Sequence, residues 1–207
     1  MDVAAVHAGL KALDPHYTDA DAERYAALLA ELERWNRKVN LTAIRDPREM
    51  ITAHLQDSLA ARPLLHGVAV LDVGTGAGFP GLPLAMAEPD RHFWLLDATE
   101  KKIRFVEHAA ALLGLGNVTA VHARVEDYAP GHRFDTVIAR AVASAPRLLE
   151  TAGHHVGEDG VFVALKGRDP AGELQGLPDA WAADVIELAV PGLAPGSRHA
   201  VVMRRAG

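Results

Sequence analysis

The sequence has no cysteine, which excludes disulfide bonds and metal sites built on thiolates. It also has no apolar run near the roughly 20 residues that a membrane-spanning helix needs. Its first residues lack the basic and then apolar pattern of a secretory signal peptide. No Gly-x-Ser-x-Gly, Walker or zinc-ligand pattern occurs, so hydrolase and NTPase functions have no support. We expect a soluble, cytoplasmic protein that binds neither a membrane nor a metal.

The composition suits one large domain, or a domain with an appendage. Of the 207 residues, 49% are hydrophobic, which is enough for a full core. A net charge of −6 argues mildly against a surface that binds nucleic acid throughout, but it allows a local basic patch. Basic residues do cluster in one segment, at Arg34, Arg37, Lys38, Arg45 and Arg48. Charge alone favours solvated helix faces for them.

The first 63 residues show helical patterns and no strand pattern. Helices are predicted over residues 4–13, from about 18 to 39, and over 47–61. Thr18 and Asp21 have the spacing of a capping box, and Asn40 is placed to end the second helix as its C-cap. The sequence therefore predicts a helical extension over residues 1–63, followed by a second domain over residues 64–207.

From residue 68 onward strand and helix patterns alternate, which is typical of a parallel α/β sheet. Strands are predicted over residues 68–73, 92–97, 118–123, 134–139, 161–165, 184–190 and 200–204. Helices are predicted over residues 82–87, 100–113 and 146–156, the second capped by Thr99. The segment joining the last two strands is too short and too rich in Pro and Gly for a crossover helix, so these strands should be antiparallel. We expect a Rossmann-like sheet of seven strands whose last strand is antiparallel.

A glycine-rich turn follows the first predicted strand, with Gly74, Gly76 and Gly78 at alternate positions. Glycine lets the main chain turn sharply and approach a ligand closely. A helix N-terminus comes directly after the turn, and ligands of such sheets lie beyond the carboxyl ends of the strands. The turn suits a nucleotide-like cofactor.

Polar residues end the other predicted strands. They are Asp97 after the second strand, Arg124 to Asp127 after the third, Arg140 after the fourth, and Lys166, Gly167 and Arg168 after the fifth. An acid in the position of Asp97 can accept hydrogen bonds from both hydroxyls of an adenosine ribose. It could instead belong to a surface turn or neighbour an N-cap.

An NAD-dependent oxidoreductase is the competing interpretation, because residues 76–81 satisfy G-x-G-x-x-G. Two features count against it. Pro80 and Pro83 lack the N–H groups that a pyrophosphate would need, and Asp72 would place negative charge beside that anion. The same acid suits a cofactor with a cationic ammonium or sulfonium, such as S-adenosylmethionine.

Residues 71–81 resemble the first motif of class I S-adenosylmethionine-dependent methyltransferases. The Gly-Phe-Pro-Gly ending is similar to one family, the bacterial 16S ribosomal RNA guanine-N7 methyltransferases, also called glucose-inhibited division protein B. Further similar segments follow in the family's order, over residues 35–43, 54–58, 124–126, 140–141, 164–167 and 197–199. The resemblance covers roughly residues 24 to 205. One departure is Ala98-Thr99 after Asp97, where relatives often carry Ser.

The resemblance implies a class I methyltransferase fold and methylation of N7 of guanine 527 in 16S ribosomal RNA. It implies cofactor contacts at Gly74, Phe79, Val125, Glu126 and Arg140, and the wider methyltransferase fold adds Asp97. With Asp72, Gly76 and Gly78 from the turn, these are the predicted cofactor residues. The predicted catalytic residues are Arg124, Arg140, Arg198 and Asn40.

Several roles stay open at the level of sequence. Arg124, Arg140, Lys166 and Arg198 suit O6 of guanine, flanking phosphates or the cofactor carboxylate, and each could instead form a surface ion pair. Asn40 either borders the guanine pocket or only caps its helix. His54 and Asp57, three residues apart, are predicted as a helix-surface pair rather than metal ligands. The sequence leaves open whether the substrate is free RNA, the assembled 30S subunit or its precursor. The protein is expected to be a monomer. A non-catalytic module that binds the cofactor and assists ribosome assembly is the third hypothesis.

Overall fold

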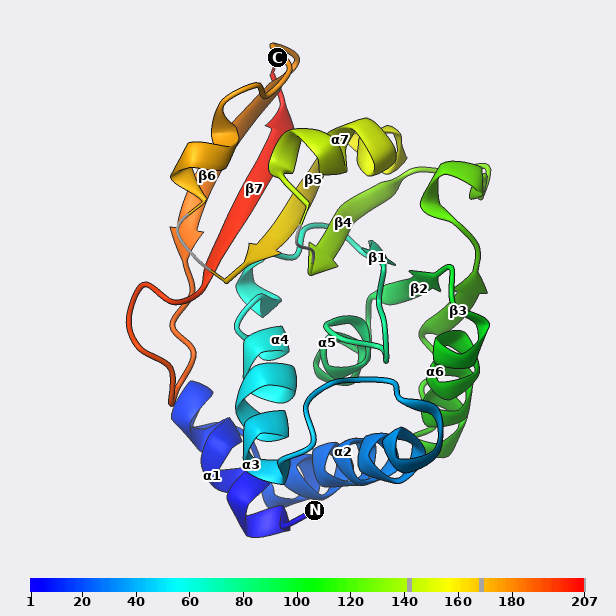
Figure 1. The fold of residues 1–207 in the computed structure, drawn as a ribbon, viewed down its shortest axis with the longest axis vertical. Helices are drawn as coiled ribbons and strands as arrows, with labels where there is room; N and C mark the ends of the chain where they lie inside the picture. Colours follow the sequence, from blue (N-terminus) through cyan, green and yellow to red (C-terminus); the bar gives the residue numbers. More distant parts are fainter. Residues whose placement is uncertain (141–142, 168–169, 207) are drawn as a thin grey trace.

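The computed structural model describes residues 1–140, 143–167 and 170–206. Within them, seven strands form one sheet in the order β3-β2-β1-β4-β5-β7-β6 (Figure 1). Their bounds are β1 Ala69–Val73, β2 His92–Asp97, β3 Val118–His122, β4 Phe134–Arg140, β5 Val156–Lys166, β6 Trp181–Glu187 and β7 His199–Arg205. Strand β7 runs antiparallel to both of its neighbours, β5 and β6, whereas the pairs among β1 to β5 are parallel. The predicted fold class is confirmed.

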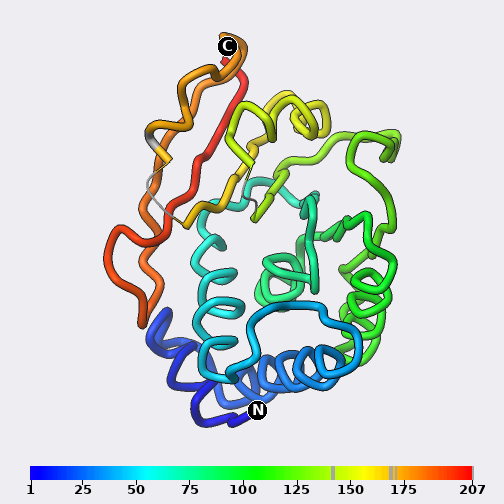
Figure 2. Tube along the Cα trace, in the orientation of Figure 1, coloured from blue at the N-terminus to red at the C-terminus, as the bar shows by residue number. Residues whose placement is uncertain are grey.

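The helices follow the predicted order. The α-helices are α1 Val3–Leu13, α2 Asp19–Val39, α3 Pro47–Met50, α4 Asp57–Leu59, α5 Gly81–Ala87, α6 Glu100–Leu112 and α7 Ala145–Ala152. The π-helix η1 covers Ile51–Gln56, and the 3-10 helices are η2 Arg62–Leu64, η3 Val125–Asp127, η4 Gly153–His155 and η5 Ala171–Leu174. In Figure 2, α1 and α2 lie together at the N-terminal end, and the helices from α3 to α4 rise from them toward the sheet. No helix of the described residues is long and apolar enough to cross a membrane.

The helical extension shares its core with the α/β part of the chain. One cluster of buried residues contains Leu28 and Leu55 from the extension together with Leu82 and Phe93 from α5 and β2. The Tyr25 hydroxyl adds a buried hydrogen bond to the Pro83 carbonyl at 3.1 Å. Each fully buried leucine contributes about 1.5–3 kcal/mol of transfer free energy. The extension is therefore held firmly against the sheet.

Two cap predictions had different outcomes. The predicted capping box of Thr18 and Asp21 is present at the start of α2. Thr99 is the N-cap residue of α6, which begins at Glu100 as predicted, but the Thr99 side chain makes no capping hydrogen bond. The Asp97 carboxylate accepts from the Thr99 amide at 2.8 Å.

Several element boundaries differ from the predictions, and β5, expected over residues 161–165, covers Val156–Lys166. The helix expected over residues 146–156 is α-helical to Ala152 and continues as the 3-10 helix η4 to His155, whereas Val156 pairs with Phe134 in the sheet. Gly160 lies in β5, where a Cβ would be only 2.8 Å from the Phe134 carbonyl oxygen. Strand β6 lies at Trp181–Glu187, three residues earlier than the predicted 184–190. The helix expected over residues 47–61 is interrupted by η1.

Candidate functional site

The glycine turn between β1 and α5 borders open space. Gly74, Gly76 and Gly78 have φ values of +68°, +62° and +83°, which L side chains rarely adopt. A Cβ at Gly74 would meet nothing within 4 Å, and one at Gly76 would meet only the Gly74 oxygen at 4.0 Å. A Cβ at Gly78 would collide with Leu82 Cδ1 at 2.3 Å. Gly74 and Gly76 thus leave room for a ligand, whereas Gly78 allows close packing.

Asp72 fixes the shape of this turn. It is fully buried, and its Oδ2 accepts hydrogen bonds from the Thr75 hydroxyl at 2.6 Å and the Gly81 amide at 2.9 Å. Burial raises the pKa of Asp72 to about 6. Its Oδ1 is buried without a protein partner. The turn therefore carries a carboxylate whose second oxygen is free to favour a cation nearby.

The first turn of α5 has no donor available for a pyrophosphate. The Gly81 amide is used by Asp72, and the Leu82 and Leu84 amides donate to the Gly78 and Pro80 carbonyls. Pro83 has no N–H. A dinucleotide would need such donors at this helix end, so the geometry argues against the NAD interpretation.

Asp97 lies directly beside the glycine turn. Its Oδ2 accepts from the Gly76 amide at 3.0 Å and lies 3.4 Å from the Lys102 ammonium, while its Oδ1 accepts from Thr99. A carboxylate has about four lone-pair sites, so acceptor capacity remains. The sheet brings together two predicted cofactor residues that are far apart in sequence.

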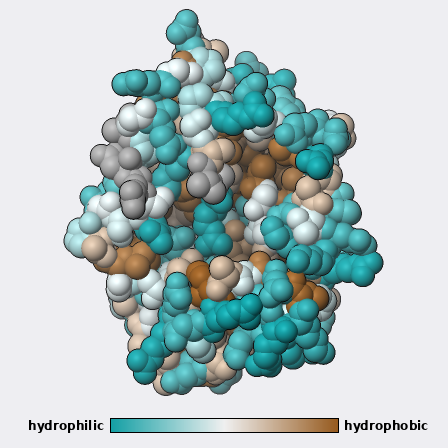
Figure 3. Space-filling model, in the orientation of Figure 1, coloured by the Kyte–Doolittle hydropathy of each residue, from teal (hydrophilic) through white to brown (hydrophobic). Residues whose placement is uncertain are grey.

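Arg124, Val125 and Glu126 follow β3, the strand next to β2. They begin at the carboxyl end, where the Ala123 amide donates to the Asp97 carbonyl at 3.3 Å. His155 holds the Val125 carbonyl at 3.1 Å, and Arg124 and Glu126 are exposed. The space-filling view in Figure 3 shows hydrophobic residues in a hollow where Figure 1 has β1, β2 and β4, framed by hydrophilic ones. Such a hollow suits an apolar ring.

Arg140 and Arg198 meet in a cavity of about 370 Å³ beyond the ends of β4 and β5. Both contact Asp57: its Oδ1 accepts from Arg198 Nε at 2.7 Å, and its Oδ2 lies 3.5 Å from Arg140 Nη1. Lys166 also lines the cavity, donating to the Ala143 carbonyl and lying 2.7 Å from a Glu173 carboxylate oxygen. Three cationic side chains and the carboxylate of Asp57 thus line one cavity, and arginines there suit an anionic or guanine-containing ligand.

His54 connects this cavity to the glycine turn. Its ring stacks on Phe79 with centroids 4.8 Å apart, its Nδ1 lies 3.4 Å from Arg140 Nη2, and its Nε2 lies 3.0 Å from the Thr42 hydroxyl. Burial, and secondarily the Arg140 charge, lowers the pKa of His54 to about 3. The ring is therefore neutral, and because arginine only donates, Nδ1 accepts and Nε2 carries the proton.

The prediction that His54 and Asp57 form a helix-surface pair is wrong, since they are only 4% and 7% exposed. Sequence reasoning assigned neither to the site, although residues 54–58 were among the segments that resemble the family. The described residues contain no group of three candidate metal ligands.

Asn40 is the C-cap of α2 in a left-handed conformation with φ of 47°. Its Oδ1 accepts from Arg45 at 3.0 Å, and its side chain is exposed. The buried Asn36 braces the following loop through the Leu41 and Thr42 amides, and Ile44 of that loop lines the cavity. The helix-cap role of Asn40 is confirmed.

Arg168 lies outside the described residues, as do residues 141 and 142.

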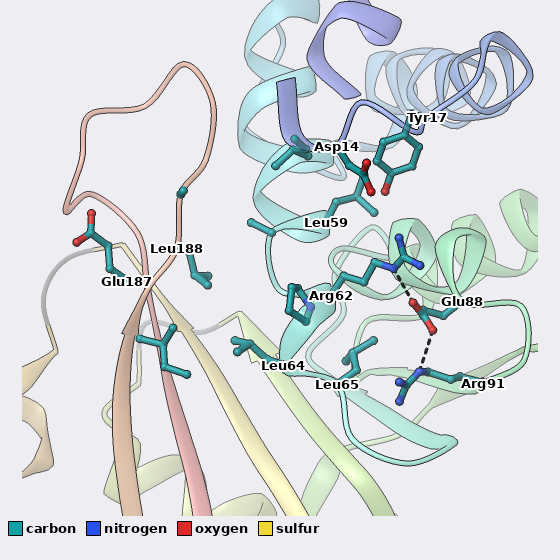
Figure 4. Close-up of a pocket in the computed structure, with 15 residues that line it drawn as sticks. Asp14, Tyr17, Leu59, Arg62, Leu64, Leu65, Glu88, Arg91, Glu187 and Leu188 are labelled. Carbon is teal, nitrogen blue, oxygen red and sulfur yellow. Dashed lines mark hydrogen bonds and ion pairs between the residues drawn. The ribbon is translucent and has the colours of Figure 1, made fainter. Parts of the chain in front are cut away.

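A larger cavity, of about 640 Å³, lies elsewhere and holds none of the predicted site residues. Figure 4 shows it between the end of α1, η2 and the segment after β6, with Glu88 paired to Arg62 and Arg91. Leu188 lines both cavities, but the larger one lies away from the carboxyl ends of β1 and β4.

Comparison with known proteins places the chain among methyltransferases. The GidB family model, described as rRNA small subunit methyltransferase G, matches residues 20–201. A relative of that name from Idiomarina loihiensis is 48% identical over 91% of both chains. Another from Methylococcus capsulatus is 44% identical over 96% of this chain and 97% of its own.

Solved structures share the fold. The M. jannaschii TYW2 structure in complex with AdoMet has a TM-score of 0.59 at 17% identity, covering 82% of this chain and 80% of its own. The ribosomal protein L11 methylase from Lactobacillus delbrueckii subsp. bulgaricus has a TM-score of 0.55 at 17% identity, covering 73% and 77%.

Proposed function

The chain belongs to the GidB family, rRNA small subunit methyltransferase G, and from this we propose that it methylates N7 of a guanine, at position 527, in 16S ribosomal RNA. It is an S-adenosylmethionine-dependent methyltransferase. The observation that carries the substrate proposal is the cavity with Arg140, Lys166 and Arg198, which adjoins the glycine turn through the His54–Phe79 stack. A cationic substrate cavity beside a cofactor turn is what methylation of an anionic polymer needs.

The residues at the turn fit the cofactor. We assign the open space beside Gly74 and Gly76 to its methionine part, with Gly78 and Phe79 shaping the turn. Asp97 would accept from the ribose hydroxyls, and Val125 and Glu126 would border the adenine. The buried charge of Asp72 and its unpartnered oxygen favour a cationic centre over an anionic one.

In this reaction the main task of the protein is to orient the guanine base and the methyl group. Bound S-adenosylmethionine supplies an electrophilic methyl group on a sulfonium. N7 of guanine has an in-plane lone pair and no proton, so no side chain is needed as a general base. Arg140 and Arg198 would therefore orient the base through O6 or hold its phosphates while leaving N7 free, and such positioning can supply most of the acceleration.

The remaining assignments complete the substrate side. Exposed Arg124 would contact RNA phosphates beside the cofactor, and Asn40 would border the guanine pocket through the loop that it begins. Because the net charge is −6, we propose that free RNA binds poorly and that the substrate is the 30S subunit or an assembly precursor. We further propose that the enzyme acts as a monomer in the cytoplasm, away from membranes.

The test is methyl transfer from labelled S-adenosylmethionine to 30S subunits, free 16S RNA and unrelated RNA, followed by mass mapping of the modified nucleotide. We expect label at N7 of one guanine, with the subunits preferred over free RNA. RNA that is bound but unmodified would support a non-catalytic module. Calorimetric titration with S-adenosylhomocysteine and NAD separates the oxidoreductase alternative, since saturable binding of NAD alone would overturn the proposal.

A further inference from the structure

Asp57 joins two arginines that come from separate parts of the chain. Arg140 ends β4 and Arg198 precedes β7, while Asp57 begins α4 in the helical extension. The Asp57 side chain is 9% exposed, and each arginine side chain is 29% exposed. One nearly buried carboxylate therefore holds two half-buried guanidinium groups that line the same cavity.

The contacts with Asp57 fix the direction of these arginines. Arg198 uses its Nε for Asp57 and its Nη1 for the Ser197 carbonyl at 2.9 Å. Arg140 is held by Asp57, by the Ala53 carbonyl at 2.9 Å and by His54. A guanidinium has five N–H donors in a fixed plane, so fixing two or three of them sets where the others point. Without the carboxylate the two cations would repel each other across the cavity.

The π-helix η1 explains how one short segment contacts Arg140 through both Ala53 and Asp57. The Asp57 amide donates to the Thr52 and His54 carbonyls rather than to Ala53, which an α-helix would use. The Ala53 carbonyl instead accepts from Arg140. Single turns of π-helix are frequent at functional sites, and here the irregular turn presents a carbonyl and a carboxylate to the same guanidinium.

We propose that Asp57 is a positioning residue for RNA methylation, which orients Arg140 and Arg198 toward the target nucleotide. The proposal rests on the proposed function. Asp57 does not touch the reacting atoms; it acts through the two arginines. Its loss should therefore lower kcat, because a misplaced guanidinium can cost up to about a hundredfold in rate. It should not weaken RNA binding, because removing a negative charge makes the cavity more cationic.

The experiment compares Asp57→Asn with Glu88→Gln, which makes the same carboxylate-to-amide change between two arginines in the larger cavity. Both variants are assayed with 30S subunits at temperatures well below their unfolding midpoints. For Asp57→Asn we expect kcat to fall about tenfold or more, KM for the subunit to stay equal or decrease, and the Kd for S-adenosylhomocysteine to change less than about twofold. Glu88→Gln should keep its kcat.

A double-mutant cycle with Arg198→Ala adds a readout that a purely structural role would not move. If Asp57 acts through Arg198, the loss in kcat for the double variant should be clearly smaller than the product of the two single losses. Additive losses, an unchanged kcat in Asp57→Asn, or an equal loss in Glu88→Gln would each overturn the positioning role. A wild-type enzyme that methylates no ribosomal RNA overturns the proposed function and this role with it.

If Asp57→Asn does not fold, the variants Arg198→Lys and Arg198→Ala test whether the oriented guanidinium of Arg198 is needed. Lysine keeps the charge but has no fork of donors to be oriented by a carboxylate. The positioning role predicts that Arg198→Lys loses nearly as much kcat as Arg198→Ala. Retained activity in Arg198→Lys would mean that charge alone is needed, and would contradict the proposal.

Discussion

Two cavities of this molecule contain the same arrangement, one carboxylate between two arginines. Asp57 holds Arg140 and Arg198 in the smaller cavity, and Glu88 holds Arg62 at 2.5 Å and Arg91 at 3.0 Å in the larger one. What differs is their surroundings. The first lies at the carboxyl ends of β4 and β5 with Lys166 beside it, whereas the second lies between η2 and the end of α5. Volume and charge pairing alone do not identify the functional site; position in the sheet does.

The arginines of the two clusters differ in the groups that they contact. Arg62 and Arg91 connect the extension and the start of β2 to the end of α5, and Arg91 also donates to the Gly67 carbonyl. Those contacts join neighbouring segments of the fold. The other two arginines point toward a cavity that adjoins the cofactor turn. We therefore expect the Glu88 cluster to affect stability and the Asp57 cluster to affect catalysis.

The largest effect should come from removing one arginine of each cluster. Arg198→Ala should lower methylation of the 30S subunit about a hundredfold, while the affinity for S-adenosylhomocysteine changes less than about twofold. Arg91→Ala should keep the methylation rate and lower the unfolding temperature, because its contacts are internal. Steady-state assays, calorimetry and thermal unfolding measure the three quantities. Equal losses of methylation and cofactor affinity in Arg198→Ala would refute its assignment to RNA.

Asp97, which we propose as a ribose ligand, lies outside both clusters and beside the glycine turn. Asp97→Ala should weaken binding of S-adenosylhomocysteine by roughly 1–3 kcal/mol, about 5- to 150-fold, the scale of a charge-assisted hydrogen bond. Isothermal titration calorimetry measures this, with exposed Asp90→Ala as the matched control. An unchanged affinity would remove Asp97 from the site.

Substitution of His54 should affect both cofactor binding and catalysis, because His54 stacks on Phe79 and contacts Arg140. His54→Ala removes an aromatic contact of about 0.5–1.5 kcal/mol, so cofactor affinity should fall by roughly 2- to 13-fold, and kcat should fall with it. Tyr17→Ala in the larger cavity is the control and should change neither. A His54→Ala variant that loses only kcat would show that the stack does not support the cofactor turn.

The smallest effect concerns acid stability of the Glu88 cluster. Burial alone would raise the pKa of Glu88, but hydrogen bonds from Arg62 and Arg91 outweigh it and hold the pKa below 4.5. Stability from this group is thus present above pH 4.5 and is lost as the pH falls through the lowered pKa. Between about pH 6 and pH 3 the unfolding temperature of Glu88→Gln should decline less steeply than that of wild type, by about 2–4 °C. Parallel curves would contradict a stabilising role.

The cofactor half of the site could be predicted further than the substrate half. The spacing of Gly74, Gly76 and Asp97 follows from local strand and turn patterns, and the structure brings Gly76 and Asp97 within hydrogen-bond distance. The burial of Asp57 could not be predicted, because its partners are Arg140 and Arg198, and a separation of 141 residues between Asp57 and Arg198 leaves no periodic signal. The error at Val156, the last residue of the helix expected over 146–156, has a similar cause, since its strand pairing with Phe134 overrides the helical pattern.

Strand β7 lies inside the sheet, between β5 and β6, although it is the last strand in chain order. During translation β6 leaves the ribosomal exit tunnel before β7, and its only sheet neighbour among the described strands is β7. The edge of β5 that pairs with β7, and the whole of β6, therefore remain unpaired until residues 199–205 have left the tunnel. Arg198 arrives with the same stretch of chain, so a nascent enzyme acquires the β5-β7-β6 part of its sheet and the second arginine of its cavity together.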